Sequence, residues 1–348
     1  MGIMQSRRRF VTNAAVASAA GFISLNAISR GGGGRSFAAE PPPEITTIRL
    51  ERDPYLCIAP QVVEELLRAE GFTDIRYVDL TPELIRRAEA ANMGGLSGMI
   101  ARGEVDFSRA FAPDHLWTLD AGGPVTILAG LHVGCVEVIA REDIRAIADL
   151  KGKVVGCAVA DKALLSIMAR LIGLDPANIR WVDTLFAEPI QLFTEGKIDA
   201  FAAFPPVLQE ARARNVGHVI ASLISDRPWS QYYCCLLGTR TEFAHKYPVA
   251  TKRVLRAILK GADLCVSQPA RMAQLLVDNG YLARYDYALQ GLNDMRYDVW
   301  RDYDPEDSLR FYGLRLYEAG LIKSNPQKLI AEHTDWRFLN ELKRELKT

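Results

Sequence analysis

Two adjacent cysteines occupy the middle of QYYCCLLG, residues 231–238. A neighbouring pair of thiols could act as a redox couple, bind a metal ion or supply a nucleophile. The stretch predicts a strand, however, and consecutive residues of a strand point to opposite faces of the sheet. Cys234 and Cys235 are therefore not expected to share one metal ion or one partner. A buried cysteine acts as a small apolar side chain, and we expect that role here.

The other residues that could do chemistry show no catalytic or metal-binding spacing. The sequence has no C-x-x-C, no G-x-S-x-G and no paired histidines on one helix face. The glycine-rich stretch at 94–103 lacks the lysine and the preceding strand of a phosphate loop. We therefore expect no catalytic residue, no metal site and no cofactor. The five histidines are scattered along the chain: His115, His132, His218, His245 and His333.

Aromatic and charged side chains collect where the predicted strands end. In open α/β sheets, ligands bind beyond the carboxyl ends of the strands. Aromatic rings there can stack on flat organic molecules and on cations. We therefore expect a small organic solute, with an aromatic or heterocyclic molecule as the finer expectation. The candidate ligand-binding residues are Tyr55, Arg109, Phe111, His132, Asp161, Lys162, Phe204, Trp229, Tyr232 and Tyr233.

Each candidate also has a purely structural interpretation, which the sequence leaves open. Any one ring could belong to the ordinary core, and His132 could be a buried histidine with satisfied hydrogen bonds. Arg109 could hold a ligand carboxylate or take part in a structural ion pair. Asp161 could meet an amine or cap a helix, and Lys162 could pair with a carboxylate or lie in solvent.

Alternating strand and helix patterns must position these residues. Apolar runs at 46–50, 74–80 and 200–204 predict strands. The spacing of apolar residues at 58–71 predicts a helix that ends near a glycine. Such alternation is typical of an α/β protein whose mixed sheets are flanked by helices, and the length favours two lobes. The apolar run at 124–140 is too long for one strand, so we expect it to leave one lobe and enter the other.

The N-terminus has the pattern of an export signal. SRRRFV, residues 6–11, precedes an uncharged, alanine-rich stretch and then small residues, which is the order of a secretory signal. The paired Arg7 and Arg8 predict the twin-arginine route. The predicted signal spans 1–38, with cleavage after it and a linker at 39–45. An uncleaved membrane anchor and a disordered basic tail stay open as alternatives.

The charge balance argues against a nucleic-acid partner. The chain has 42 basic and 42 acidic residues, but residues 1–38 hold five arginines and no acid. Without these five arginines the balance is 37 basic to 42 acidic residues. Nucleic-acid binders carry basic surfaces instead.

Five segments spread over about residues 46–325 carry a resemblance to a known family. In this order they resemble the periplasmic solute-binding proteins of ABC importers. They are most similar to the nitrate-, sulfonate- and taurine-binding group, which shares its fold with thiamine-pyrimidine synthases. The segments are GEVDF (103–107), DLKGKVVG (149–156), LIGLDPANIRWV (171–182), EGKIDAFAAFPP (195–206) and TEFAHKYPVATKRVLRAIL (241–259).

This resemblance implies a two-lobed, type II-like periplasmic-binding-protein fold, in which two crossing strands near 133–137 and 230–235 form a hinge. It implies one lobe from 46–133 and 234–348 and a second lobe from 134–233. The implied function is capture of a solute between the lobes and delivery to an ABC permease in the inner membrane. The protein would be a periplasmic monomer without enzymatic activity. A thiamine-pyrimidine-synthase-like enzyme and a solute-sensing receptor subunit stay open as alternatives.

The sequence departs from the family pattern where the ligand would be recognised. Many relatives place small hydroxyl residues after the strand at 153–159, where they and the helix N-terminus suit an anion. Here the stretch reads CAVADKALL, and no serine occurs before Ser166. An anion held by hydroxyl groups is therefore not expected.

A disulfide across the hinge is a further open question. Cys135 lies on the outgoing crossing segment, and Cys234 and Cys235 lie on the returning one. An oxidising exterior permits such a bond. However, the twin-arginine route exports proteins already folded in the reducing cytosol, and the geometry of neighbouring strands is often wrong for a disulfide.

Overall fold

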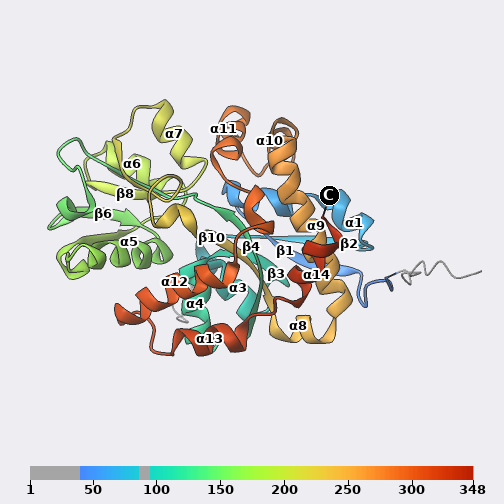
Figure 1. Ribbon diagram of the computed structural model, residues 1–348. Helices are drawn as coiled ribbons and strands as arrows, with labels where there is room; N and C mark the ends of the chain where they lie inside the picture. Colours follow the sequence, from blue (N-terminus) through green and yellow to red (C-terminus); the bar gives the residue numbers. More distant parts are fainter. Residues whose placement is uncertain (1–39, 86–94, 348) are drawn as a thin grey trace, which may run out of the picture. The chain divides into compact units, whose positions relative to one another are not determined.

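The computed structural model describes residues 40–85 and 95–347 (Figure 1). The predicted signal at 1–38 and the first residue of the predicted linker lie outside the described residues. Among the residues that are described, no helix is both long and apolar enough to cross a membrane.

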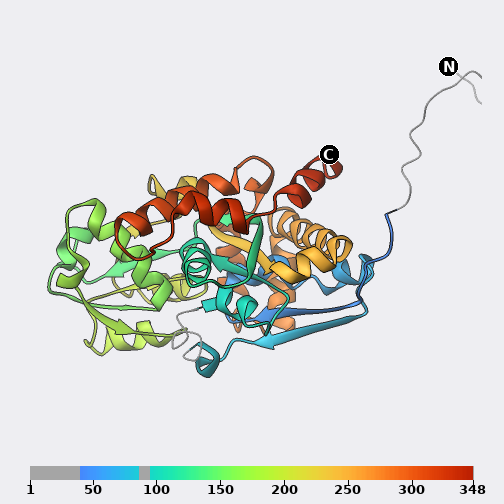
Figure 2. The ribbon, with the colours of Figure 1, turned by 90° about the horizontal axis from the view of Figure 1, so that it is seen from below.

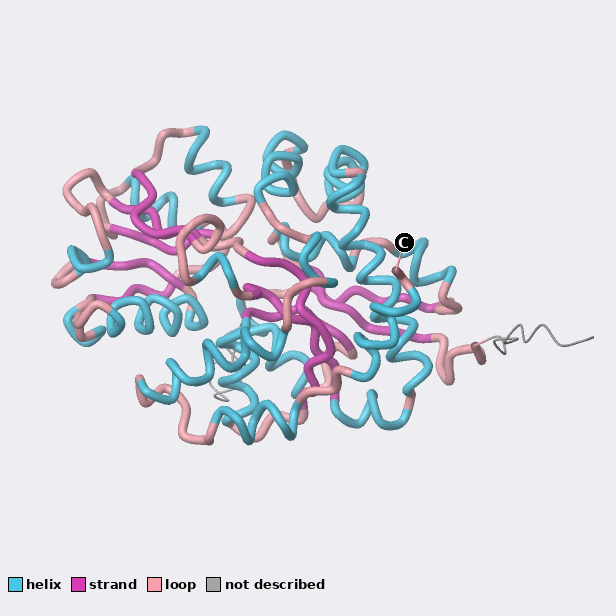
Figure 3. The backbone as a smooth tube through the Cα atoms, in the orientation of Figure 1, coloured by secondary structure: helices cyan, strands magenta, loops and turns pink. Residues whose placement is uncertain are grey.

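The described part of the chain contains two five-stranded sheets, which form separate magenta groups in Figure 3. Their strands are β1 (Thr47–Arg52), β2 (Asp74–Asp79), β3 (Phe107–Phe111), β4 (Val125–Val133), β5 (Glu137–Ala140), β6 (Val154–Cys157), β7 (Arg180–Asp183), β8 (Ala200–Ala203), β9 (His218–Ser222) and β10 (Tyr233–Arg240). The first sheet has the order β2-β1-β3-β10-β4, and only β10 runs antiparallel to its neighbours. The second has the order β7-β6-β8-β5-β9, in which β5 runs antiparallel to β8 and β9.

Helices flank both sheets. In the view from below, the C-terminal helices α12, α13 and α14 lie together along one side of the sheets (Figure 2). The described α-helices are α1 (Glu64–Ala69), α3 (Gly95–Ala101), α4 (Ala112–Asp120), α5 (Val159–Leu171), α6 (Glu188–Thr194), α7 (Val207–Ala213), α8 (Thr241–Lys246), α9 (Pro248–Ser267), α10 (Pro269–Asp278), α11 (Tyr285–Asp294), α12 (Pro305–Glu318), α13 (Pro326–His333) and α14 (Arg337–Glu345). The described 3-10 helices are η1 (Leu56–Gln61), η2 (Ile147–Leu150), η3 (Pro176–Asn178), η4 (Trp229–Gln231) and η5 (Asp298–Arg301).

The two sheets are the centres of two lobes, and the chain crosses between them twice. The outgoing crossing follows directly from β4 of the first sheet, which ends at Val133, to β5 of the second, which begins at Glu137. The return leads from β9 through η4 into β10. The apolar run at 124–140 is thus two strands of different sheets, as predicted, and the two-lobed α/β fold is confirmed.

The predicted helix at 58–71 is broken into two short pieces. The 3-10 helix η1 contains Pro60, and the α-helix α1 begins only at Glu64. Proline has no backbone N–H and its ring clashes with the preceding turn of an α-helix, so one continuous helix is not favoured here. As a result, η1 is a separate and fully buried turn that follows Tyr55 and contains Cys57.

The hinge strands pack closely where β10 crosses β4. A Cβ atom on Gly130 would lie 2.4 Å from the ring of Tyr233, so only glycine leaves space for this ring. Tyr233 is fully buried, and its hydroxyl donates a hydrogen bond to the carbonyl oxygen of Val299 at 2.8 Å. The Tyr233 side chain therefore links β10 to η5.

Candidate ligand-binding site

A pocket lies between the two lobes, at the carboxyl ends of the parallel strands β6, β7 and β8. This is the edge of a sheet at which α/β proteins bind ligands. Tyr55, which follows β1 in the first lobe, closes the pocket from the other side. The free space is about 10 Å³, roughly enough for a single water molecule. The lining residues are Tyr55, Ala158, Asp161, Thr184, Phe186, Pro189, Ala202, Ala203, Phe204 and Val207.

Aromatic rings from both lobes meet in this pocket. The ring centroid of Tyr55 lies 5.8 Å from that of Phe186 and 5.7 Å from that of Phe204. Phe111, at the end of β3, contacts Phe204 from the first lobe at 6.5 Å. These tilted and edge-on arrangements are the ones that aromatic pairs favour. Tyr55, Phe111 and Phe204, predicted separately as ligand contacts, are thus brought together.

Asp161 supplies a buried carboxyl group to the same pocket. It is the third residue of α5, is 4% exposed, and accepts a hydrogen bond from the backbone N–H of Ala158 at 3.3 Å. Burial raises the pKa of Asp161 to about 7, because a charged carboxylate is disfavoured away from water. The side chain therefore caps its own helix and also presents a titratable carboxyl group to the pocket.

A buried ion pair supports the position of Tyr55. The Arg109 guanidinium lies 2.6 Å from Asp53, and both side chains are almost fully buried. The other carboxylate oxygen of Asp53 accepts the backbone N–H of Tyr55 at 2.8 Å. Burial acts to lower the pKa of Arg109, but the carboxylate of Asp53 raises it above its ordinary value. Arg109 therefore lies behind the pocket wall, in ion-pair contact with Asp53.

Lys162 lies on the exposed side of α5, and its ammonium group is 5.7 Å from the ring centroid of Trp181. It is not among the residues that line the pocket. Neighbouring residues of a helix point in different directions, which explains why Asp161 faces the pocket while Lys162 does not.

The rings at the returning crossing pack against α12 instead of the pocket. The Tyr232 ring stacks on Phe311 with centroids 3.9 Å apart and planes 15° apart. Trp229 contacts Phe311 edge-on at 5.5 Å and is buried. The backbone N–H of Tyr233 donates to the hydroxyl of Ser308 at 2.8 Å. Trp229, Tyr232 and Tyr233 therefore join β10 to α12.

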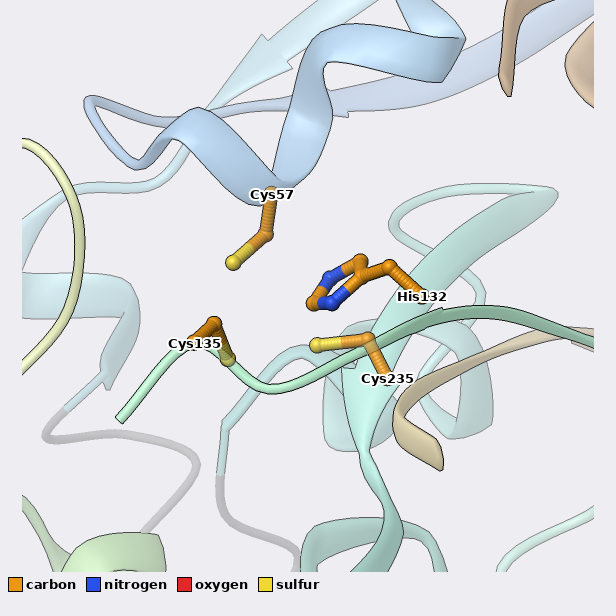
Figure 4. A group of neighbouring side chains, drawn as sticks. All are labelled: Cys57, His132, Cys135 and Cys235. Atoms are coloured by element: carbon orange, nitrogen blue, oxygen red, sulfur yellow. The ribbon is translucent and has the colours of Figure 1, made fainter. Parts of the chain in front are cut away.

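His132 lies on β4 in a cluster of sulfur atoms. Its ring and the thiols of Cys57, Cys135 and Cys235 converge from separate segments of the chain (Figure 4). All four side chains are buried, and the cysteines of the chain are free thiols. Cys234, the neighbour of Cys235, is not one of these four residues. Its thiol nevertheless also contacts Cys135, so the expectation that Cys234 and Cys235 would not share a partner is wrong: the outgoing segment places Cys135 within reach of both.

Phe186 is a lining residue that sequence patterns do not single out. It follows β7 and has a φ of 52°, in the left-handed region that non-glycine residues seldom adopt. Such strain is often found at binding sites, where the surrounding structure maintains it. The sequence signal was weak, because an isolated phenylalanine in a loop does not reveal its backbone conformation.

Direct contacts also join the lobes beside the pocket. The backbone N–H of Leu56 in η1 donates to the carbonyl oxygen of Pro205 at 3.0 Å. Arg212 on α7 pairs with Asp294 on α11 at 2.7 Å. These contacts hold the two walls of the pocket together in this conformation.

Comparison with known proteins assigns the family. A family model described as NMT1/THI5 like matches residues 86–272, just over half of the chain. The chain belongs to the NMT1/THI5-like family. One curated protein that is similar to this chain is a candidate binding protein of Brucella abortus (strain 2308), which is 25% identical over 179 residues. That match covers 51% of this chain and 56% of the relative, so the chain spans little more than half the length of the curated relatives it matches.

Solved structures share the fold of this NMT1/THI5-like chain. The periplasmic nitrate-binding protein NrtA of Synechocystis PCC 6803 has a TM-score of 0.73 at 14% identity, covering 88% of this chain and 90% of that one. The alkanesulfonate-binding protein SsuA of Xanthomonas axonopodis pv. citri, bound to MOPS, has a TM-score of 0.68 at 16% identity, with coverages of 86% and 100%. The desulfurization enzyme DSZB has a TM-score of 0.60 at 15% identity, with coverages of 86% and 99%. The two-lobed fold is thus that of periplasmic binding proteins, and it also occurs in an enzyme.

Proposed function

We propose that this protein is the extracytoplasmic solute-binding component of an ABC importer. It captures a small organic solute between its lobes and delivers it to a permease in the inner membrane. The observation that carries this proposal is the pocket that Tyr55 closes from one lobe and Asp161, Phe186 and Phe204 close from the other. A site shared between two lobes couples binding to lobe closure.

The pocket favours a flat organic molecule with an amine or another positively charged group. Its rings offer faces for stacking, and the Asp161 carboxylate offers a partner for a cation. The hydroxyl-bearing side chains among the described lining residues are Thr184 and Tyr55, so a nitrate or sulfonate group would find few donors. Entry requires the lobes to separate, because the present space accommodates only about one water molecule.

The mechanism needs no covalent step. The lobes separate by bending at the crossing segments near 133–137 and 230–235, the solute stacks against the rings, and closure buries it. The closed form presents surfaces of both lobes to the permease. The first lobe consists of 46–133 and 234–348, and the second consists of 134–233. The binding form is a monomer.

Export occurs by the twin-arginine route and places the protein in the periplasm. Arg7 and Arg8 are the residues that the translocation machinery recognises. Replacing both by lysine should leave the protein in the cytoplasm, measured by cell fractionation and immunoblotting. Unchanged periplasmic amounts would exclude this route while leaving the binding function untouched.

The binding function is tested by recovering the solute from purified protein and identifying it by mass spectrometry. Adding that solute back should raise the melting temperature, because a ligand that binds only the folded state stabilises it. The solute should also remain chemically unchanged after prolonged incubation. Conversion of the solute into a product would contradict the proposal and favour an enzyme.

A further inference from the structure

The buried sulfur cluster at the hinge has the geometry of a metal site. The ligand atoms of Cys57, His132, Cys135 and Cys235 all lie within 4.8 Å of one another. In a tetrahedral zinc site with Zn–S bonds of about 2.3 Å, sulfur atoms lie about 3.8 Å apart. The distances between the ligand atoms therefore need to shorten by only about 1 Å at most to satisfy tetrahedral coordination.

His132 supplies an independent observation. Its side chain is completely buried, yet neither ring nitrogen has a hydrogen-bond partner of good geometry, and its polar neighbours are the thiols of Cys57 and Cys235. Buried polar atoms are almost always paired, so an unpaired imidazole requires an explanation. Figure 4 shows the ring directed toward the three sulfur atoms. Coordination of a metal ion would give one of these nitrogens a partner.

We propose that Cys57, His132, Cys135 and Cys235 bind one zinc ion. Three cysteines and one histidine are an established ligand set of closed, four-coordinate structural zinc sites. All four positions around the metal are filled by protein, so the ion has no open position for a substrate. The site is therefore structural and distinct from the solute pocket.

Zinc is chosen over monovalent copper because of the net charge that each ion would leave in the site. Three thiolates with a neutral imidazole carry three negative charges, which zinc reduces to one and monovalent copper only to two. Residual charge is costly in a fully buried place. The nearby Arg109 guanidinium interacts electrostatically with Cys57 and Cys235, but it is already paired with Asp53.

The positions of the ligands give the site a mechanical role. His132 and Cys235 are register partners on the crossing strands β4 and β10, and Cys135 lies on the outgoing segment between β4 and β5. Cys57 lies on η1, two residues after Tyr55. A metal ion here would link both crossings to η1, the turn that directly follows Tyr55, so that the hinge bends around a fixed point.

The test uses the reduced full-length protein, freed of metal with a chelator and checked for folding by circular dichroism. Titration with cobalt(II) should give intense visible bands of a tetrahedral ion and thiolate-to-cobalt absorption in the near ultraviolet, saturating at one ion per chain. Zinc should displace the cobalt and raise the melting temperature. Metal analysis after gel filtration should find one zinc ion per chain.

Variants locate the site. Cys135→Ser and His132→Gln should weaken zinc binding by at least about 100-fold. Cys157→Ser and Cys265→Ser are matched controls, since both cysteines are buried but lie outside the cluster and away from its thiols, and they should retain full binding. If the cluster variants do not fold, the cobalt spectrum of the unmutated protein decides whether thiolates hold the ion in tetrahedral coordination. Absence of stoichiometric metal, equal binding by folded Cys135→Ser, or retention of monovalent copper in preference to zinc would each overturn the proposal.

Discussion

The guanidinium of Arg212 lies 2.7 Å from a carboxylate oxygen of Asp294, so one ion pair joins α7 of the second lobe to α11 of the first. Arg212 also contacts Glu137 of its own lobe at 2.7 Å. Removing Asp294 therefore breaks this ion pair and the hydrogen bond that Gln209 on α7 donates to Asp294 at 3.2 Å, while the contact within the second lobe remains. The two inter-lobe partners are about one-third exposed, which limits the strength of the pair.

Asp294→Ala should shift the protein toward the open form. An ion pair of this exposure contributes about 0.2–1 kcal/mol, so solute affinity should fall by up to roughly five-fold. Calorimetric titration measures the affinity, and small-angle scattering of the solute-free variant should show a larger radius of gyration. Glu195→Ala is the control, because Glu195 pairs with Lys197 within the second lobe. An equal effect of both variants would contradict a role of the inter-lobe pair in closure.

Tyr55→Ala should weaken solute binding by roughly five-fold to more than a hundred-fold, since a stacked ring contributes on the order of 1–3 kcal/mol. Phe204→Ala should act in the same direction, and Tyr317→Ala, which removes an exposed ring, should have no effect. Tyr232→Ala should mainly lower the melting temperature, because Tyr232 stacks on Phe311. Loss of affinity in Tyr232→Ala with no loss in Tyr55→Ala would show that the solute binds at the returning crossing and not in this pocket.

Asp161 should make the stability of the solute-free protein depend on pH. Its pKa of about 7 in the folded state exceeds the ordinary value of 3.8, so the folded state binds the proton more tightly than the unfolded state. Stability therefore decreases as pH rises from about 4 to 7, with a total loss of roughly 4 kcal/mol from this group. Asp161 interacts electrostatically with four other titratable groups, namely Tyr55, Cys157, Cys234 and Asp114.

Asp161→Asn cannot ionise and should be more stable than the unmutated protein at pH 8, with a difference that vanishes near pH 4. Urea unfolding at a series of pH values measures this difference, in which the titration of all other groups largely cancels. A constant difference across the range would show that Asp161 is ionised throughout. The same variant should bind a cationic solute more weakly at pH 8.

Arg109→Met should destabilise the protein by about 3–5 kcal/mol, because it leaves the buried Asp53 carboxylate without its partner. Chemical denaturation measures the loss. Arg68→Met removes an exposed pair with Glu64 and should cost less than about 1 kcal/mol. Solute affinity of Arg109→Met should also fall, since Asp53 holds the backbone of Tyr55. Stability equal to that of Arg68→Met would show that the buried pair contributes nothing.

The fold is largely predictable because its signals are local. Alternation of apolar residues marks strands such as 74–80, and the length of the run at 124–140 reveals the crossing between lobes. The helix expected at 58–71 shows the limit of such patterns, since Pro60 interrupts it. Asp161 and Phe204 could be expected at the edge of the second sheet where the pocket lies, because both follow strands of that sheet.

The cysteine cluster could not be predicted, because its members come from distant segments. Cys235 and His132 become neighbours only through the pairing of β10 with β4, and Cys57 joins them only because η1 packs beside the hinge. No short spacing in the sequence encodes this arrangement. The left-handed backbone of Phe186 is also a consequence of its surroundings rather than of its residue type.

Strand β10 occupies the middle of the first sheet, between β3 and β4, although it follows the whole second lobe in the sequence. On a translating ribosome, β3 and β4 have no antiparallel neighbour until residue 240 has emerged. All five strands of the second sheet lie within 137–222, so that lobe can complete its sheet earlier. Pairings between distant segments form slowly, and unpaired strand edges attract other chains. A nascent chain paused before Tyr233 would therefore expose the edges of β3 and β4 to chaperones, and these edges close only when the last part of the first lobe has been synthesised.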